Sequence, residues 1–208
     1  MNALLQLVRA PAALTVLGDT VAGAAAAGRP LRGRRLLLPL SSAAFYWSGM
    51  ALNDWADRKL DAEERPERPI PSGRVTPQGA LAVAGGLTAA GFGLAAAGGG
   101  RDSVALALPL AAAVWTYDTL LKSTAAGPLG MAACRTFDVL MGAGAAGLRP
   151  ALPAAVAMGT HTLGVTALSR GEVHGGSPVT AATALAGTAA ATVAAVGGRA
   201  RSGRHRLG

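Results

Sequence analysis

Long runs of uncharged residues alternate along this chain with short segments that hold most of its charges. Ala and Gly dominate the runs, but several approach the roughly 20 residues that a helix needs to span a bilayer. The pattern therefore predicts about seven membrane helices. We place these helices near residues 11–27, 36–52, 78–99, 103–117, 127–148, 151–168 and 178–197.

Small residues recur within the apolar runs, as in the segment 142–147. Because Gly and Ala let membrane helices approach closely, these positions favour a packed bundle over separate anchors. The sequence thus predicts an all-α, polytopic transmembrane helical bundle that forms one domain over residues 1–198. The Arg-rich residues 199–208 are predicted to be a disordered basic tail.

The composition agrees with a membrane protein and argues against a nucleic-acid-binding one. Only 14% of the 208 residues are charged, whereas a soluble domain usually has about 25%. The net charge of +8 could indicate a nucleic-acid partner, but the arginines lie between apolar runs, where juxtamembrane loops that meet lipid are expected. Cys134 is the only cysteine, which excludes an internal disulfide and a Cys-rich metal site.

The charge pattern does not settle the orientation in the membrane. The positive-inside rule would place the Lys/Arg-bearing segment 53–77 in the cytoplasm. The segment 28–35 lies one crossing earlier, so it should lie on the opposite side, yet it also holds several arginines. Either one apolar segment does not span the membrane or the charge bias is weak.

The most informative segment is 53–61, which directly follows the second apolar run. At helical spacing Asn53, Asp57 and Asp61 are expected on one face, with Asp54 beside them. Carboxylates crowded near a helix C-terminus oppose the helix dipole and favour a compensating cation. Mg²⁺ is the candidate, because it takes oxygen ligands and shares them with substrate phosphates. The alternative interpretation is a solvated loop of mixed charge.

This motif, Asn53-Asp54-x-x-Asp57-x-x-x-Asp61, is followed by Arg-Pro-Ile-Pro-Ser-Gly-Arg-Val-Thr at 68–76. Together they resemble the UbiA superfamily of intramembrane prenyltransferases. A downstream run resembles more narrowly the EboC-like branch of that superfamily; it comprises Tyr117-Asp118, Lys122, Gly127-Pro128 and Cys134-Arg135. The resemblance implies a bundle that usually has nine helices, so this chain is expected to lack the last two. It also implies transfer of a prenyl group from a prenyl diphosphate to an acceptor, with Mg²⁺ as cofactor.

The resemblance also implies roles for individual residues. Those implied to hold Mg²⁺ against the diphosphate are Asn53, Asp54, Asp57, Asp61 and Glu172. Those implied to be catalytic are Asp57, Asp61 and Lys122, and those implied to contact the diphosphate are Asn53, Arg68, Arg74 and Lys122. A guanidinium grips phosphate bidentately, although each of these cations could instead meet a lipid headgroup. Glu172 is the only carboxylate in the place of the family's second acidic motif.

Other ionisable residues lie in or beside apolar segments, where they are costly and are usually paired or functional. Arg135 and Asp138 are three positions apart, which predicts an ion pair between them. Asp19 has no partner nearby in sequence, so it either lines an acceptor pocket or pairs with Arg135 across the bundle. Asp118 belongs to the same group of residues.

The leading hypothesis is an Mg²⁺-dependent prenyl transfer enzyme at the cytoplasmic face of a bacterial plasma membrane. Its partners would be a prenyl diphosphate, a small-molecule acceptor that the sequence does not identify, and membrane lipid. The alternative is a non-catalytic membrane protein that binds a prenyl diphosphate or assists export of a small metabolite. A CDP-alcohol phosphotransferase is disfavoured, because Asp57-Arg58 and Asp61-Ala62 do not supply its Asp-Gly and Ala-Arg steps.

Overall fold

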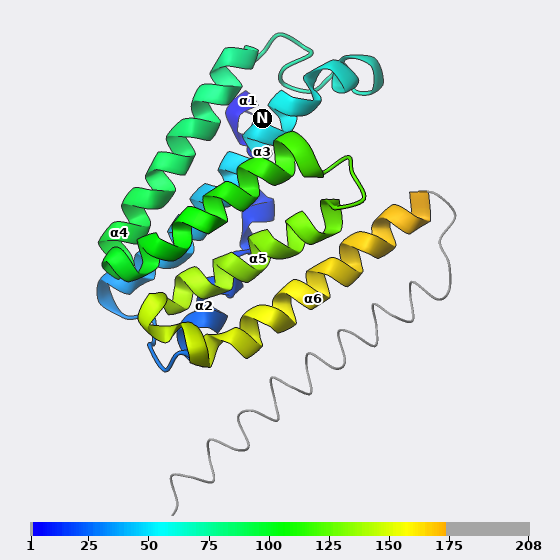
Figure 1. Cartoon of the computed structure of the whole chain (residues 1–208). Helices are drawn as coiled ribbons and strands as arrows, with labels where there is room; N and C mark the ends of the chain where they lie inside the picture. Colours follow the sequence, from blue (N-terminus) through cyan, green and yellow to red (C-terminus); the bar gives the residue numbers. More distant parts are fainter. Residues whose placement is uncertain (1, 174–208) are drawn as a thin grey trace, which may run out of the picture.

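A computed structural model describes residues 2–173 of the chain, with side chains described through residue 170 (Figure 1). Every regular element in this range is helical. The α-helices are α1 (Ala3–Leu7), α2 (Leu17–Ala26), α3 (Leu37–Glu64), α4 (Pro77–Thr116), α5 (Gly127–Ala143) and α6 (Leu148–Val173). The 3-10 turns are η1 (Ala10–Thr15), η2 (Gly33–Leu36) and η4 (Ala145–Gly147), and η3 (Tyr117–Leu121) is a π-helical turn.

Helix α4 consists of two helical segments that meet at Gly100. This residue has φ 64° and ψ −155°, a conformation essentially restricted to glycine. The chain reverses there, so the second half of α4 runs back along the first, as Figure 1 shows. The indole Nε1 of Trp115 donates to Thr88 Oγ1 at 3.0 Å across this hairpin. The predicted separation of segments 78–99 and 103–117 is therefore confirmed.

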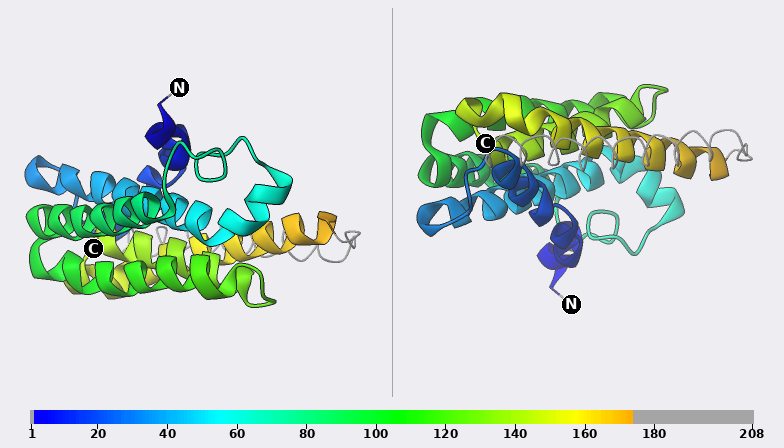
Figure 2. Two further views of the ribbon diagram at one scale, coloured as in Figure 1. Left: turned by 90° about the horizontal axis from the view of Figure 1, so that it is seen from above. Right: turned by 90° about the horizontal axis from the view of Figure 1, so that it is seen from below.

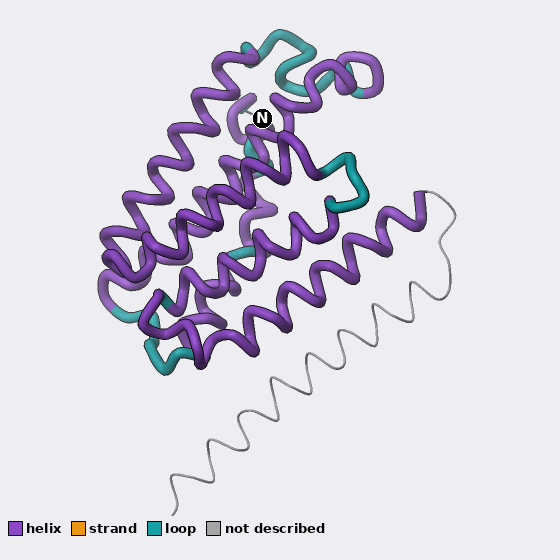
Figure 3. Tube along the Cα trace, viewed as in Figure 1, coloured by secondary structure: helices purple, strands orange, loops and turns teal. Residues whose placement is uncertain are grey.

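Successive helices pack side by side in alternating directions. Ser41 and Ser48 of α3 donate to the carbonyl oxygens of Gly91 and Ala84, at 2.7 and 2.8 Å, and so fix α3 against the first half of α4. Helix α5 packs between the second half of α4 and α6 and also contacts α2. The connecting segments consequently gather at the two ends of the bundle (Figure 3).

Helices α2 and α5 approach closely because a glycine on each helix faces the backbone of the other. A Cβ atom added at Gly23 would lie 1.8 Å from the carbonyl oxygen of Val139, and one added at Gly142 would lie 2.3 Å from that of Thr20. No larger residue fits at these positions without moving a helix. The prediction that small residues allow close packing is confirmed at this crossing.

The predicted helix near 36–52 is longer than its apolar run. Helix α3 continues to Glu64, so the acidic motif lies on the helix itself. The run 11–27 divides into η1 and α2. By length and composition alone, two described helical stretches qualify as candidate membrane spans, Pro77–Leu121 and Ala145–Arg170. The predicted segment 178–197 and the tail 199–208 lie outside the described residues.

The N-terminal residues pack beneath the loop that follows α3. Leu7 is fully buried in a cluster with Leu52 of α3, Ile70 of the loop and Ala80 of α4. Figure 2 shows α1 and this loop, residues 65–76, on the same side of the bundle. The cluster thereby anchors the loop beside the end of α3 that holds the acidic motif.

Candidate functional site

The acidic motif on α3 separates into two groups that face different partners. Asp54 and Asp61 form the first group and are only 4% and 1% exposed. The guanidinium of Arg68 bridges them, at 3.3 Å from Asp54 Oδ1 and 2.8 Å from Asp61 Oδ2. Arg9 adds a second ion pair to Asp54 at 3.2 Å. These carboxylates therefore tie the 65–76 loop and the N-terminal segment to α3.

Asn53 and Asp57 form the second group, together with two residues at the end of the α4 hairpin. Lys122 Nζ lies 2.7 Å from Asp57 Oδ1 and donates to the backbone carbonyl of Asn53 at 3.3 Å. The side-chain Nδ2 of Asn53 donates to Asp118 Oδ1 at 3.1 Å. Asp118 was not among the predicted site residues, although its place beside an apolar run was a signal for it.

Helical geometry explains why Asp61 does not join Asn53 and Asp57. At 3.6 residues per turn each residue advances the direction by about 100°, so Asp61 points about 80° away from Asn53 after eight residues. It points only about 20° from Asp54, which is seven residues away. The expected common face of Asn53, Asp57 and Asp61 holds for the first pair, whereas Asp61 shares its partner with Asp54.

The π-helical turn η3 brings Lys122 and Asp118 to the motif. The amide of Lys122 donates to the carbonyl of Tyr117 at 2.9 Å, one residue further back than in an α-helix. Single π-helical turns interrupt otherwise regular helices and are frequent at functional sites. The π-helical turn lies at the end of the α4 hairpin. The side chains of Asp118 and Lys122 there point toward α3 and bond to Asn53 and Asp57.

The remaining predicted residues lie at the edge of this site. The guanidinium of Arg74 is exposed. It donates hydrogen bonds to Ser72 Oγ at 2.9 Å, to the Glu67 carbonyl at 2.6 Å and to the side chain of Gln6. Its predicted contact with a diphosphate stays a prediction. Position 172 lies in α6, but the side chain of Glu172 falls outside the described ones.

Burial changes the electrostatics of the first group. Asp54 lies beyond the apolar run 36–52, near the end of the bundle. Loss of solvation raises the pKa of its carboxyl above the ordinary value, and the nearby Arg9 and Arg68 oppose that rise. The two arginines thus compensate a carboxylate that would otherwise be costly to bury.

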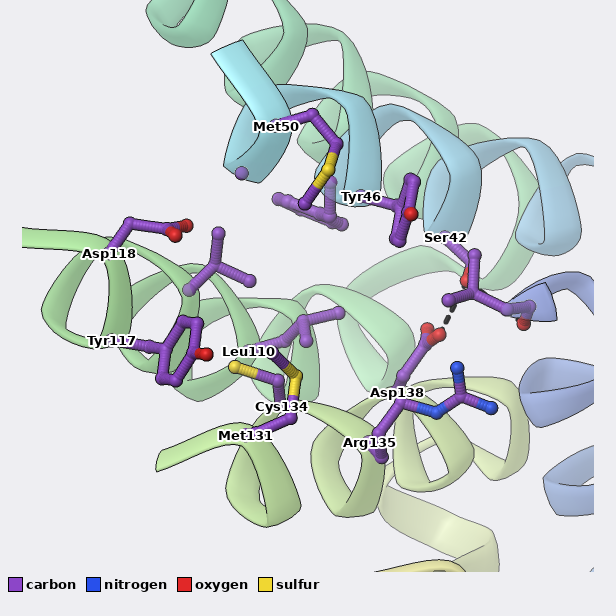
Figure 4. Close-up of a pocket in the computed structure, with 14 residues that line it drawn as sticks. Ser42, Tyr46, Met50, Leu110, Tyr117, Asp118, Met131, Cys134, Arg135 and Asp138 are labelled. Carbon is purple, nitrogen blue, oxygen red and sulfur yellow. Dashed lines mark hydrogen bonds between the residues drawn. The ribbon is translucent and has the colours of Figure 1, made fainter. Parts of the chain in front are cut away.

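An apolar cavity begins beside the second group and runs into the bundle between α3, α4 and α5 (Figure 4). The space inside it, together with the open solvent that adjoins it, is about 590 Å³. Asp118 lies at one end, and Ser42, Arg135 and Asp138 lie at the other. Gly49 is also part of the lining, and a Cβ atom added there would lie 3.2 Å from Asp118. The walls between them are formed by Phe45, Tyr46, Met50, Leu110, Val114, Tyr117, Met131 and Cys134.

The predicted ion pair between Arg135 and Asp138 is wrong. Arg135 instead binds Asp19 of α2, with Nε 2.7 Å from Oδ2 and a second nitrogen 2.9 Å from Oδ1. Asp138 accepts a hydrogen bond from the hydroxyl of Ser42 on α3. The two residues are neighbours on α5, but one points toward α2 and the other toward α3. Of the two roles left open for Asp19, the structure shows the pairing with Arg135.

The donor groups suit a hard cation that is shared with a phosphate ligand. Among the described side chains, no three from Asp, Glu, His and Cys converge on one point. Mg²⁺ does not require such a cage, because it commonly uses one or two carboxylates together with waters and substrate phosphates. Asp57 is paired with Lys122 but is 29% exposed, so it is the motif carboxylate most open to such a ligand, with Asn53 beside it; Asp54 and Asp61 are buried and share Arg68.

Comparison with known proteins gives a family match over most of the chain. The profile of the UbiA prenyltransferase family matches residues 14–198. A digeranylgeranylglyceryl phosphate synthase from Methanopyrus kandleri is 38% identical over 125 residues, which are 60% of this chain and 45% of that protein. The corresponding protein from Ignicoccus hospitalis is 40% identical over 125 residues, 60% of this chain and 40% of its own. The chain thus spans less than half the length of these curated relatives.

A further relative and a solved structure also resemble this chain. A 4-hydroxybenzoate octaprenyltransferase from Pseudomonas putida is 39% identical over 67 residues, 31% of this chain and 23% of that protein. A solved structure concerned with digeranylgeranylglyceryl phosphate synthase in membranes superposes with a TM-score of 0.72 at 19% identity. That superposition covers 83% of this chain and 63% of the other, and it shows that the two share a fold.

Proposed function

Because the chain belongs to the UbiA prenyltransferase family, we propose that it transfers a prenyl group from a prenyl diphosphate to an acceptor within the membrane. The observation that carries this proposal is a polar group beside an apolar cavity: Asp118 lines one end of the cavity and bonds to Asn53, which lies next to the Asp57–Lys122 pair. The polar group suits a diphosphate, and the apolar cavity suits the hydrocarbon chain attached to it.

The chain is an integral membrane protein, and its family generally depends on a divalent metal. We propose Mg²⁺ as that metal, held by Asn53 and Asp57, with Glu172 as a further ligand. When bound, the cation neutralises charge on the diphosphate. A bacterial plasma membrane is proposed as the location, although relatives come from archaea as well as from Pseudomonas putida.

Lys122 is the chain's own electrostatic contribution to the chemical step. As the bond between the allylic carbon and the diphosphate oxygen breaks, negative charge grows on the leaving group. The ammonium group of Lys122 is already fixed by Asp57 and by the Asn53 carbonyl, so it needs little rearrangement to meet that charge. Arg68 contributes by holding the 65–76 loop through Asp54 and Asp61, and its direct contact with the diphosphate stays a prediction.

The relatives suggest which substrates to test. Two of them are named for a product that carries two geranylgeranyl groups on glyceryl phosphate. We therefore propose geranylgeranyl diphosphate as the donor and a prenylated glyceryl phosphate as the acceptor. The apolar walls of the cavity suit the hydrocarbon part of such a donor. The narrower resemblance to the EboC-like branch, and with it a role in metabolite export, stays a prediction.

The test is diphosphate release by the purified protein in nanodiscs, with Mg²⁺, labelled geranylgeranyl diphosphate and geranylgeranylglyceryl phosphate. Asp57→Asn and Lys122→Met are each expected to lower the rate about 100-fold or more, the scale expected when a preorganised charge is lost. Lys59→Met is the matched control, because Lys59 is an exposed lysine on the same helix. Mg²⁺-dependent binding of the diphosphate without any release would contradict the transferase and favour the non-catalytic alternative.

A further inference from the structure

The end of the bundle opposite the acidic motif carries more arginines than its carboxylates balance. Three connections meet there: the segment 27–36 between α2 and α3, the turn of α4 at Gly100, and the segment 144–147 between α5 and α6 (Figure 1). The basic residues in or next to these connections are Arg29, Arg32, Arg34, Arg35, Arg101 and Arg149. Asp102 is the only carboxylate in or next to them. This end therefore presents a surplus of positive charge.

Two of these arginines fix the 27–36 segment to the end of α5. Arg29 pairs with Asp102, with Nη1 3.4 Å from Oδ2, and donates to the Ala143 carbonyl at 3.1 Å. Arg35 donates to the Gly142 carbonyl at 2.9 Å. Burial and the nearby charge of Arg29 lower the pKa of Arg35, although Asp102 opposes that shift. An anion beside these guanidinium groups would relieve the repulsion between them.

The charges of Arg32 and Arg34 are not used in the same way. Both side chains are exposed, and neither forms a hydrogen bond or an ion pair with the residues that the structure describes. Gly33 lies between them with φ 56°, a left-handed conformation that glycine adopts readily and that turns the chain at this point. The two guanidinium groups are therefore open to a ligand from outside the chain.

An apolar groove adjoins these two arginines. Its lining includes Val21, Ala24 and Ala25 of α2 and Pro30, Leu31 and Leu36 of the 27–36 segment, and every residue that lines it is apolar or glycine. Arg32 directly follows Leu31 in the chain, and Arg34 lies two residues before Leu36. Because consecutive Cα atoms are only about 3.8 Å apart, the basic side chains begin at the edge of the groove.

An anionic phospholipid has both of the parts that this surface fits. Its phosphate accepts paired hydrogen bonds from a guanidinium group, and basic pockets between membrane helices bind such headgroups. The chain is an integral membrane protein, so phospholipid headgroups surround the ends of its helices. A free phosphate ion would use the arginines but leave the groove empty.

We propose that this end of the bundle binds one anionic phospholipid, with its phosphate on Arg32 and Arg34 and an acyl chain in the groove. The lipid would contact both α2 and the 27–36 segment and so hold them together. The site is separate from the acidic motif and does not depend on the proposed transfer reaction.

The experiment follows thermal unfolding of the full chain in detergent while dioleoyl phosphatidylglycerol is added, with dioleoyl phosphatidylcholine as the neutral reference. A ligand that binds only the folded state raises the midpoint with its concentration, and this dependence gives the dissociation constant. The anionic lipid is expected to bind at least about tenfold more tightly than the neutral one. Each arginine beside the headgroup contributes roughly fivefold, so the double variant R32Q/R34Q should weaken binding of phosphatidylglycerol about 30-fold.

The double variant R101Q/R149Q is the matched control. It removes the same charge from the same end of the bundle, from two exposed arginines that do not belong to the 27–36 segment. It should weaken binding about fivefold or less. Equal losses in the two double variants would show a diffuse attraction of charge without a defined site, and they would overturn the proposal, as would equal binding of the two lipids.

The groove and the source of the phosphate are tested separately. Ala25 is exposed and lines the groove, so Ala25→Phe should fill the space of the acyl chain and weaken phosphatidylglycerol about tenfold. Ala89→Phe, at an exposed position of α4 outside the groove, should leave binding unchanged. Inorganic phosphate should not displace the lipid. Displacement by phosphate, or unchanged binding in Ala25→Phe, would overturn the proposed lipid; the midpoint without lipid reports whether each variant folds, and Ala25→Leu replaces Ala25→Phe if the ring prevents folding.

Discussion

Replacing Arg68 by Ala tests whether the bridge between Asp54 and Asp61 holds the site together. Both carboxylates are almost fully buried, and Arg68 itself is only 21% exposed. Removing one partner from a buried ion pair costs about 3–5 kcal/mol. Asp54 keeps Arg9 at 3.2 Å and Asp61 keeps Arg65 at 3.6 Å, but these arginines are 42% and 51% exposed and compensate less. We therefore expect a loss of about 3 kcal/mol, the lower end of that range.

The measurement is thermal unfolding of the detergent-solubilised protein, followed by tryptophan fluorescence. For a chain of this size, 1 kcal/mol corresponds to about 2–4 °C, so the midpoint of Arg68→Ala should fall by about 6–12 °C. Arg68→Lys should give an intermediate fall, because an ammonium group keeps the positive charge but is more strongly hydrated than a guanidinium, so burying it costs more.

Arg74→Ala is the control for this prediction. Arg74 lies in the same loop but is exposed, and its partners are neutral groups. Exposed polar contacts of this kind contribute about 1 kcal/mol or less. Equal falls in the midpoints of Arg68→Ala and Arg74→Ala would show that the buried bridge carries no special weight, and the reasoning would then be refuted.

Three further outcomes are expected. Gly23→Ala should destabilise the protein by about 2 kcal/mol or more, because the added Cβ would meet the Val139 carbonyl. Gly18→Ala should be nearly neutral, because nothing lies within 4 Å of a Cβ atom added there. Chemical unfolding in detergent checks both variants. Gly100→Ala should cost about 1–3 kcal/mol in the same assay, because its conformation is essentially restricted to glycine. Removing divalent metal with EDTA should abolish diphosphate release but lower the unfolding midpoint little, because Asp54, Asp57 and Asp61 each pair with Arg or Lys; a collapse of the fold would contradict this.

The acidic motif on α3 shows which contacts the spacing of residues along a sequence can predict and which it cannot. Spacing along α3 correctly placed Asn53 and Asp57 together, because residues four apart share a helix face. It misplaced Asp61. At 3.6 residues per turn, Asp61 points about 80° away from Asn53, eight residues earlier, but only about 20° away from Asp54, seven residues earlier. Likewise, three-residue spacing suggested a pair between Arg135 and Asp138, yet partners on other helices bind each of them more closely.

The sequence by itself determined that the chain is a helical membrane bundle, that segments 78–99 and 103–117 are separate helices, and that carboxylates lie near a proline-rich loop. These properties are local, since segment length, apolar content and glycine conformation act on neighbouring residues. Only the tertiary structure decided that Arg68 joins Asp54 to Asp61 and that Lys122 and Asp118 meet Asn53 and Asp57. It also decided that a cavity runs from Asp118 to Ser42 and Asp138. Each of these contacts joins different helices or loops, and the pairing of charges across a bundle depends on which helix faces pack together.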